Sequence, residues 1–426
     1  MLVLRVRSLG CVLLLSACSQ GEIGAYSDNW QAPTEEQVLL PESARPETLR
    51  LLTRTEFQNT VTDLGIIDDA AAIVGTFPDQ NVSDGFDNMA HSHVANPLLI
   101  EAYMRAAEML SGAALAKRVS LTASIMECAG AAGTTKACGL KFLDHFIPKM
   151  FRFLVPEEQL SSYKELFEVV FNTSGFNAAF RMSLEAALQS PDFLYRAELP
   201  NSAGTLDPFV MASRLSYFLW STMPDDELFE AARSGALSTR IGVESQARRM
   251  LEAQRAKMVV WRFSDQWLKL YRAYAVTKDR VRYPEFSPAL RGAWRTSVLA
   301  FINDQYFGDG TLEDRLLSPK VFVNQTLADL YGWQMPAPSE GYLPIEADSD
   351  RFSGLLSQPG LMAILAKSDQ SSPIHRGVFI REKLLCEHLP PPPPDAPASV
   401  PPVDDNQTTR ERVTKLTSAP NAWAVT

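Results

Sequence analysis

The sequence predicts a mainly α protein, built of multi-helical bundle domains in tandem with few or no strands. Apolar residues recur at helical spacing over long stretches, capping residues stand where these stretches begin, and strand-like alternation is scarce. The chain has 426 residues, of which 46% are hydrophobic and 21% are charged. This composition is typical of folded globular proteins, so a buried core is expected.

Residues 1–18 are predicted to be a lipoprotein signal peptide. Arg5 and Arg7 precede an apolar stretch that is too short to cross a bilayer. The segment LSAC at 15–18 has the form of a bacterial lipobox, in which the thiol of Cys18 accepts the lipid. No acidic retention signal follows the cysteine. We therefore expect an exported outer-membrane lipoprotein that faces the periplasm or the cell surface, with the membrane as a partner through its lipid anchor.

Export also affects the interpretation of the other cysteines. Cys128 and Cys138 lie ten residues apart in a segment rich in glycine and threonine, a composition typical of loops. In an oxidising compartment such a pair is expected to form a disulfide. It would close a short loop and contribute roughly 2–3 kcal/mol to stability.

The polar, proline-containing residues 19–47 are predicted to tether the lipid to the body. A first helical domain is expected at 48–118. Its first helix begins with a capping box, because Thr53 and Glu56 can each satisfy a backbone N–H that the helix leaves unpaired. A second helix is expected over 97–116.

The second helical domain is expected at 119–200 and contains the Cys128–Cys138 loop. Apolar periodicity predicts helices over about 156–172 and 176–189 in this domain.

The third helical domain is expected at 206–335. Asp207 and Pro208 form a helix start, with an N-cap followed by a first-turn proline. A long helix is expected over about 243–273, and another over about 287–308.

A fourth, incomplete domain is expected at 350–389. Residues 390–426 are interpreted as a proline-rich spacer followed by a truncated tail, because five consecutive prolines at 390–394 favour an extended polyproline conformation.

Segments along most of the chain resemble a family of secreted bacterial proteins built from tandem domains of unknown function (numbered 1587, 1595, 1592 and 1588). The similar segments are LRLLTRTEFQNTVTDLG at 49–65, FPDQNVSDGFDN at 77–88, SPDFLYRAE at 190–198, ASRLSYFLWSTMPDDELFEAARSGAL at 212–237, FVNQTLADLYG at 322–332, SPIHRG at 372–377 and TTRER at 408–412. One departure is FRFLVPEE at 151–158, where the family usually has a double arginine and a proline. The resemblance therefore assigns no role to the arginine there.

Members of this family usually continue after TTRER to a C-x-x-C-H motif, which attaches c-type haem. The last six residues, NAWAVT at 421–426, can be encoded AAT GCA TGG GCT GTC ACN. Read two nucleotides later, this string encodes Cys-Met-Gly-Cys-His. We therefore expect that a frameshift ends the chain at its haem motif. No haem is then expected in this chain, and c-type haem is expected in the full-length form.

The loop FPDQNVSDGFDN is a candidate calcium site. Its hard oxygen donors are those of Asp79, Asn81, Ser83, Asp84 and Asp87. The spacing does not match an EF-hand. Ordinary turn and cap chemistry by Asp, Asn and Gly is the favoured alternative.

A second candidate is the segment SPIHRG, in which Ser372, His375 and Arg376 could form a functional turn. The favoured alternative is a structural turn in which the histidine is incidental. The acids Asp225, Asp226 and Glu227 could form an acid/base group, but three acids in the first turn of a helix are explained by the helix dipole. Catalytic residues stay unknown.

The sequence contains no phosphate loop, dinucleotide fingerprint, serine-hydrolase elbow or H-E-x-x-H motif. The net charge of -10 argues against nucleic acid as a partner. The leading hypothesis is the helical body of a c-type-haem electron-transfer protein, which is inactive in that role as truncated. A periplasmic or surface protein complex is its expected partner. The alternatives are a cell-surface binding or scaffold protein without catalysis, and a carboxylate-dependent hydrolase.

Overall fold

The computed structural model describes residues 49–92, 95–196, 198, 205–335, 337, 339–390, 402–404 and 406–418. Cys18 and the predicted tether lie outside these residues, and so does the C-terminal hexapeptide. The described residues divide into two compact units, 49–259 and 260–418, which we call the N-terminal unit and the C-terminal unit. The division into four domains stays a prediction, and the boundary between the units falls inside the expected third domain.

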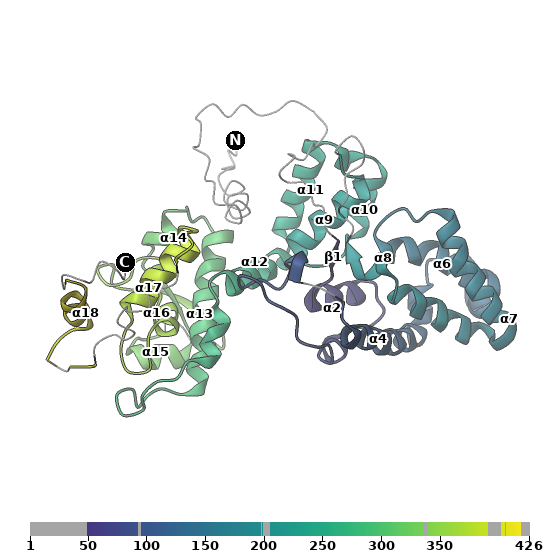
Figure 1. The fold of residues 1–426 in the computed structure, drawn as a ribbon. Helices are drawn as coiled ribbons and strands as arrows, with labels where there is room; N and C mark the ends of the chain where they lie inside the picture. Colours follow the sequence, from purple (N-terminus) through teal and green to yellow (C-terminus); the bar gives the residue numbers. More distant parts are fainter. Residues whose placement is uncertain are drawn as a thin grey trace. The chain divides into compact units, whose positions relative to one another are not determined.

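The protein is mainly α, as the sequence predicts (Figure 1). The N-terminal unit contains α2 (Arg54–Asp63), α3 (Ala71–Val74), η3 (Ala90–Ser92), α4 (Pro97–Ala116), α5 (Arg118–Leu121), η4 (Met126–Cys128), η5 (Gly130–Thr134), α6 (Lys136–Phe151), α7 (Glu157–Leu188), α8 (Pro191–Leu194), α9 (Pro208–Trp220), α10 (Asp226–Arg233), η6 (Ala236–Ser238) and α11 (Arg240–Glu252). The boundary between the units lies within α12 (Gln254–Trp267).

The C-terminal unit contains η7 (Leu270–Ala275), α13 (Pro288–Phe307), α14 (Asp314–Leu317), α15 (Gln325–Tyr331), η8 (Leu355–Ser357), α16 (Pro359–Leu365), α17 (Pro373–Phe379), η9 (Ile380–Leu384) and α18 (Thr409–Thr417). Its central helix is α13, which contacts η7, α15 and α16. Among the described residues, no helix has the length and apolar character needed to cross a membrane.

Each unit also contains a two-stranded antiparallel sheet. In the N-terminal unit, β1 (Arg50–Leu51) pairs with β2 (Tyr195–Arg196), so that Arg50 lies opposite Arg196. In the C-terminal unit, β3 (Lys320–Val323) pairs with β4 (Leu343–Glu346). The first sheet brings the start of the described chain beside a segment that follows it by well over a hundred residues.

Local sequence chemistry explains the start of α2. Thr53 is the N-cap: its hydroxyl accepts a hydrogen bond from the Glu56 amide at 3.2 Å, and the Glu56 carboxylate accepts one from the Thr53 amide at 2.8 Å. The predicted capping box is therefore present. Phe57, which follows, is fully buried and packs edge-on against Phe77 and Phe193. The cap thus fixes where the helix begins and directs its apolar face into the core.

Two of the helix predictions differ from the structure in their boundaries. The helices expected over 156–172 and 176–189 are the two halves of α7, separated at Gly175, which has φ 81° and is not helical. The single helix expected over 243–273 is wrong. Ala253 adopts an extended conformation with ψ 146° between α11 and α12, and η7 follows α12. Alanine favours helix, so this break has no local signal.

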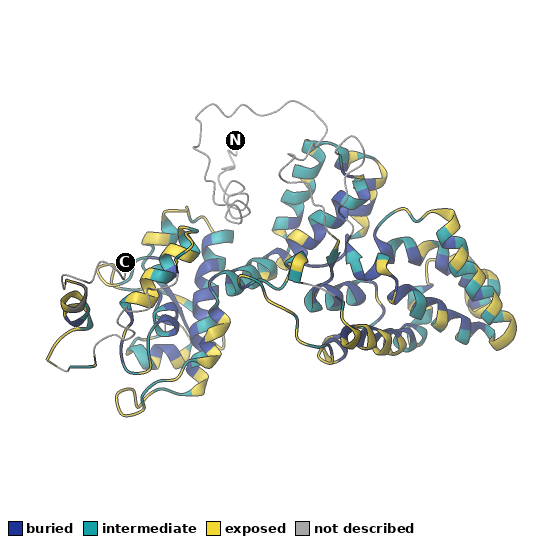
Figure 2. Cartoon of the chain, in the orientation of Figure 1, coloured by how far each residue is buried: buried dark blue, intermediate teal, exposed yellow. Residues whose placement is uncertain are grey.

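Buried residues line the inward sides of the helices in each unit (Figure 2). In the N-terminal unit, α4 and α6 both pack along α7. In the C-terminal unit, one core cluster groups Val298, Phe301 and Leu361 around α13 and α16, and another groups Val321, Val323 and Leu327 around β3 and α15.

Candidate functional site

The predicted calcium loop contains a tight two-residue turn. The Ser83 amide donates to the Phe86 carbonyl at 3.0 Å, and the Phe86 amide donates to the Ser83 carbonyl at 2.8 Å. The two residues between them, Asp84 and Gly85, have φ values of 54° and 99°. Asp-Gly is the pair that favours two successive residues with positive φ. Turn formation therefore explains the residue types at these two positions.

The other four candidate ligands of this loop interact with neighbouring groups of the same chain. Asp79 pairs with Arg54 at 3.4 Å, and the Asn81 amide group donates to the Ser92 carbonyl at 3.2 Å. Ser83 Oγ lies 3.1 Å from His91 Nε2. Asp87 also takes part in an interaction. In the described part of the chain, no group of three or more His, Cys, Asp or Glu side chains could hold a metal ion. Calcium binding by this loop stays a prediction.

The segment around Ser372 forms a helix start. Ser372 is the N-cap of α17, and its hydroxyl accepts a hydrogen bond from the His375 amide at 3.3 Å. His375 Nδ1 lies 3.2 Å from the Leu365 carbonyl oxygen, and Arg376 is exposed. Capping accounts for the serine and for the proline that follows it. A functional role for His375 and Arg376 stays a prediction.

The expected disulfide between Cys128 and Cys138 is present, with the two Cα atoms 4.8 Å apart. It joins η4 to the first turn of α6, where Thr135 is the N-cap. Cys138 is fully buried.

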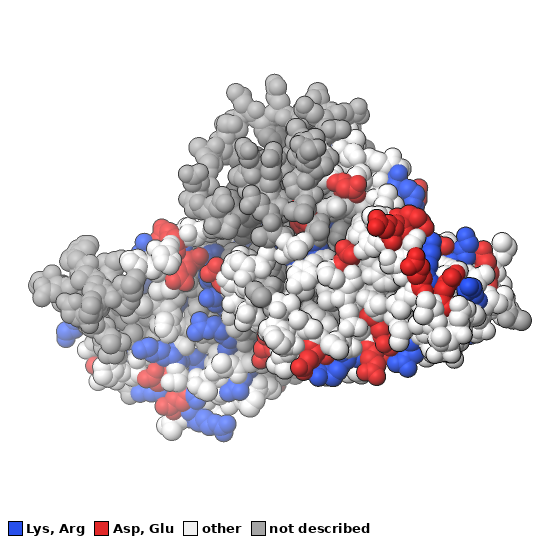
Figure 3. Space-filling model, turned by 45° about the vertical axis from the view of Figure 1, so that its right-hand side comes forward, with Lys and Arg blue, Asp and Glu red and all other residues white. Residues whose placement is uncertain are grey.

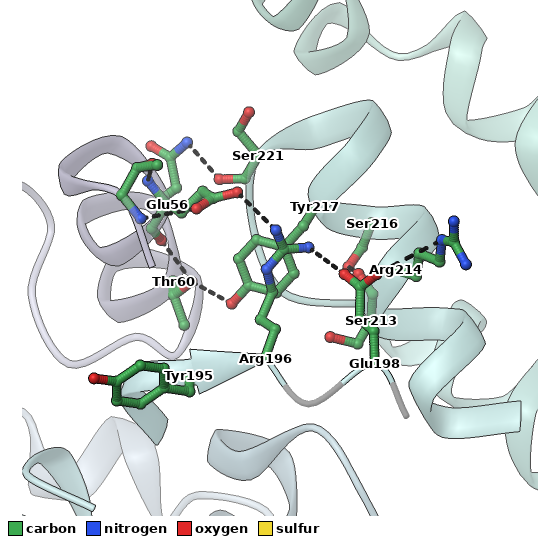
Figure 4. Close-up of polar contacts among 12 residues, drawn as sticks. Glu56, Thr60, Tyr195, Arg196, Glu198, Ser213, Arg214, Ser216, Tyr217 and Ser221 are labelled. Atoms are coloured by element: carbon green, nitrogen blue, oxygen red, sulfur yellow. Dashed lines mark hydrogen bonds and ion pairs between the residues drawn. The ribbon is translucent and has the colours of Figure 1, made fainter. Parts of the chain in front are cut away.

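A feature that the sequence did not predict lies between α2, β2 and α9: a network of buried charges around Arg196 (Figure 4). Arg196 pairs with Glu56 at 3.5 Å and donates to Glu198 at 3.1 Å. The side chains of these three residues are each less than a tenth exposed. Arg214 on α9 pairs with the other oxygen of Glu198 at 3.7 Å. One arginine thus lies between two carboxylates that come from distant parts of the sequence.

Tyr217 on α9 adds an uncharged member to this network. Its hydroxyl lies 2.7 Å from Thr60 Oγ1, which also lies 2.6 Å from the Glu56 carbonyl. The threonine has one proton and donates it to that carbonyl, so the tyrosine hydroxyl donates to the threonine. The Arg196 guanidinium stands 4.7 Å from the centre of the tyrosine ring. Burial raises the pKa of Tyr217, so this hydroxyl stays protonated at neutral pH.

Arg152 completes the network from the end of α6. It is buried, has φ 66°, and donates through Nη2 to the carbonyls of Asp192, Phe193 and Tyr195 at 2.8–3.0 Å. Its Nη1 donates to the Tyr217 hydroxyl at 3.3 Å. Arg152 lies in the segment FRFLVPEE, where the resemblance assigned no role to the arginine. In the structure this arginine binds three main-chain oxygens.

This chemistry is that of a structural ion network. Both buried carboxylates are bound by arginines, and the tyrosine is held in its protonated form. Arg196 Nε and Arg214 Nη1 have no hydrogen-bond partner among the described residues. Buried charges are costly unless they are paired, so removing one member leaves its partners uncompensated. The network therefore favours one arrangement of the three segments that meet there.

A surface hollow between α4 and α7 is lined by carboxylates, and the hydrolase hypothesis needs paired acids beside such open space. The hollow has a volume of about 470 Å³ and is lined by Glu101, Met104, Arg105, Glu108, Arg181, Glu185 and Gln189. Glu185 accepts a hydrogen bond from Ser111 Oγ at 2.6 Å and pairs with Arg181 at 3.3 Å. This acid is engaged with a hydroxyl and an arginine, an arrangement that does not favour the hydrolase.

The sequence contained a weak signal for the network. Arg196 and Glu198 stand two residues apart in SPDFLYRAE, just after an apolar patch, so both side chains of an extended segment face the same way. Nothing in the sequence indicates that Glu56 faces them, because it lies 140 residues away and is already explained as part of a capping box. The fold brings these groups together.

Four family models match the chain, and each is described as a protein of unknown function. They are PSD3 (DUF1587) at residues 50–116, PSD5 (DUF1595) at 138–198, PSD4 (DUF1592) at 206–333 and PSCyt3 (DUF1588) at 352–424. No curated protein and no solved structure matches the chain.

The matches place the members of the network in three different family domains. Glu56 lies in the first matched segment, Arg196 and Glu198 in the second, and Arg214 and Tyr217 in the third. The order of the four matches is the order expected from the sequence. The chain therefore belongs to the family of proteins in which the domains of unknown function 1587, 1595, 1592 and 1588 follow one another in tandem.

Proposed function

We propose that this chain is the helical scaffold of an exported lipoprotein, a body that holds its successive family domains in one fixed arrangement. The observation that carries the proposal is the ion network around Arg196. It contains residues of three family domains, and each buried charge in it depends on a partner from another domain or segment. Such a network favours joint folding of these domains over independent motion.

The location is part of the proposal. An outer-membrane position is supported by the lipobox LSAC at 15–18, and by the Cys128–Cys138 disulfide, which persists in an oxidising compartment. Mass spectrometry of the mature protein tests it: we expect a chain that begins at an acylated Cys18. A Cys18→Ser variant is the matched control and is expected to keep its leader. An unmodified start in the parent chain would refute the anchor.

Calorimetry tests the scaffold itself. We expect the N-terminal unit to unfold in one cooperative transition, although it contains two family domains and part of a third. An Arg196→Gln variant is expected to lower the temperature of that transition or to split it, because Glu56 and Glu198 then lose their common partner. Arg233→Gln, at the exposed pair with Glu230, is the matched control and is expected to change little. Independent melting of the domains in the parent chain would contradict the scaffold.

Electron transfer is a second candidate function, supported by one observation. The hexapeptide NAWAVT at 421–426 permits codons that encode Cys-Met-Gly-Cys-His in another reading frame. The residues present do not fit c-type haem: no C-x-x-C-H occurs in the sequence, and Cys128 and Cys138 are joined to each other. Under this candidate, haem binding is proposed only for a product that carries the motif. Sequencing the gene and haem staining of its product test this candidate, and codons that cannot yield the motif would exclude it.

A further inference from the structure

The segment that precedes α13 has an excess of positive charge, although the protein as a whole is acidic. The chain has a net charge of -10, yet residues 269–283, KLYRAYAVTKDRVRY, contain five lysines and arginines and a single acid, Asp279. We call residues 269–283 the basic segment. Three tyrosines alternate with its cations. On the face shown in Figure 3, Lys and Arg are interspersed with Asp and Glu.

The tip of the basic segment is a built turn. Asp279 Oδ1 accepts hydrogen bonds from the amides of Val281 at 2.8 Å and Arg282 at 3.2 Å. The Tyr283 amide donates to the Asp279 carbonyl at 2.8 Å. The only acid of the segment is thus bound to the backbone of the turn. Arg280, Val281 and Arg282 form the outermost part of this turn, which we call the tip.

The base of the turn is attached to the loop that follows α16. The Asp279 amide donates to the Ser368 carbonyl at 2.9 Å, and the Tyr283 hydroxyl donates to the Asp369 carbonyl at 3.2 Å. Lys278 Nζ donates to the carbonyls of Ala363 and Lys367 at 3.1 and 2.9 Å. Lys278 therefore holds the loop in place. The two arginines of the tip are exposed, and Arg282 also takes part in an interaction.

The tip exposes an apolar side chain between the two arginines. Val281 is 91% exposed, and Tyr271, Tyr274 and Tyr283 are 42%, 58% and 40% exposed. The loop before α13 projects from the C-terminal unit in Figure 1 and is coloured as exposed in Figure 2. A β-branched residue this exposed gains free energy when it leaves water, and tyrosine places an apolar ring and a polar hydroxyl at a water–apolar boundary.

We propose that the basic segment docks on an anionic phospholipid surface. Arg280 and Arg282 contact the lipid phosphates, for which guanidinium groups are suited, and Val281 enters the boundary between headgroups and acyl chains. The proposed export supplies only the biological setting. The docking itself is a property of the folded chain and is tested separately from the lipid on Cys18.

The exposed valine favours lipid over another polyanion. A nucleic acid would offer phosphates to the arginines but no apolar layer for Val281. An anionic lipid surface matches both the charge of the tip and its exposed valine.

The test uses the mature chain with Cys18→Ser, so that no covalent lipid contributes, and vesicles of phosphatidylcholine with or without phosphatidylglycerol. We expect cosedimentation with the anionic vesicles, weakened by salt, and none with phosphatidylcholine alone. Arg280→Gln and Arg282→Gln are each expected to weaken binding about fivefold. Val281→Asp is expected to weaken it further, and free inorganic phosphate is expected not to compete.

Matched controls are Arg233→Gln and Val119→Asp, which change an exposed arginine and an exposed valine of the N-terminal unit. Both are expected to bind vesicles as the parent chain does. Circular dichroism checks that every variant is folded. The proposal is overturned if the controls lose as much binding as the tip variants, if the parent chain does not bind anionic vesicles, or if it binds a DNA duplex more tightly than the vesicles.

Discussion

The hydroxyl of Tyr217 connects three helices of the N-terminal unit. It donates to Thr60 on α2 and accepts from Arg152 at the end of α6, while its own ring lies on α9. Burial raises its pKa, and the charge of Arg152 opposes that effect. The hydroxyl therefore serves as a neutral link between two helices and a buried guanidinium.

We predict that Tyr217→Phe destabilises the protein by about 1–3 kcal/mol, because it leaves a buried threonine and a buried arginine each short of a partner. Urea unfolding measures the change. Tyr271→Phe removes a hydroxyl from a tyrosine that is 42% exposed and is expected to change stability by less than about 0.5 kcal/mol. Equal effects at the two positions would contradict the role given to Tyr217.

Asp225 combines two roles at the start of α10. It is the N-cap, accepting from the Leu228 amide at 2.9 Å, and it forms a two-point pair with Arg249 at 2.7 and 3.0 Å. Burial raises the pKa of Asp225, but the bonds from Arg249 and Leu228 outweigh burial and lower the pKa overall. A carboxyl whose pKa is lowered on folding stabilises the protein at pH values above its unfolded pKa of about 3.9. This stabilisation is lost as the pH falls through the pKa that the carboxyl has in the folded protein.

We therefore predict that Asp225→Asn is less stable than the parent chain at neutral pH, by about 1 kcal/mol for a partly exposed pair. Asparagine keeps the cap, so the loss reports the ion pair. The difference is expected to shrink as the pH falls below about 4, because the parent carboxylate becomes protonated. Melting temperatures across this pH range measure it, and a difference that does not depend on pH would show that the charge plays no part.

At the scale of elements, α16 lies against α13 at unusually short range. A Cβ placed on Gly360 would stand 2.4 Å from the Trp294 carbonyl oxygen and 3.0 Å from Val298 Cγ2. The oxygen belongs to the backbone of α13 and cannot rotate away. A residue without a side chain is thus needed here, and the contact holds the core cluster of the C-terminal unit together.

We predict that Gly360→Ala destabilises the C-terminal unit by about 1–3 kcal/mol, because α16 has to move away from α13. Gly292, within α13, has nothing within 4 Å of its added Cβ. Gly292→Ala is expected to stabilise α13 by about 0.5–1 kcal/mol, since alanine loses less backbone entropy on folding than glycine does. Thermal unfolding of both variants measures the contrast, and the same sign for both would refute the packing argument.

At this scale the sequence predicted the starts of elements better than their ends. Capping residues mark their own helices: Thr53 and Asp207 each accept a backbone hydrogen bond where a helix begins. The end of α11 was missed because Ala253 favours helix. Its extended conformation accompanies a tertiary contact, since Trp220 Nε1 donates to the Met250 carbonyl at 2.8 Å. Local patterns do not encode a contact that reaches back thirty residues.

At the scale of the whole molecule, the disulfide links the location to stability. We predict that the double variant Cys128→Ser and Cys138→Ser destabilises the N-terminal unit by about 2–3 kcal/mol, because the unfolded chain regains the freedom of a short loop. The melting of the C-terminal unit is expected to stay unchanged in this variant, because it contains neither of the two cysteines. Calorimetry of the variant and the parent chain measures this, and an unshifted N-terminal transition would be the contrary result.

The sequence by itself determined the helical class, the capping residues, the Asp-Gly turn, the cysteine pair and the family order, because each is written in neighbouring or closely spaced residues. Only the tertiary structure decided the ion network, since Glu56 and Arg196 are 140 positions apart and each has a local explanation. It also decided the break at Ala253 and the exposure of Val281. Contacts between residues far apart in the sequence decide which local conformational preferences persist in the folded protein. The pattern within one segment does not encode those contacts.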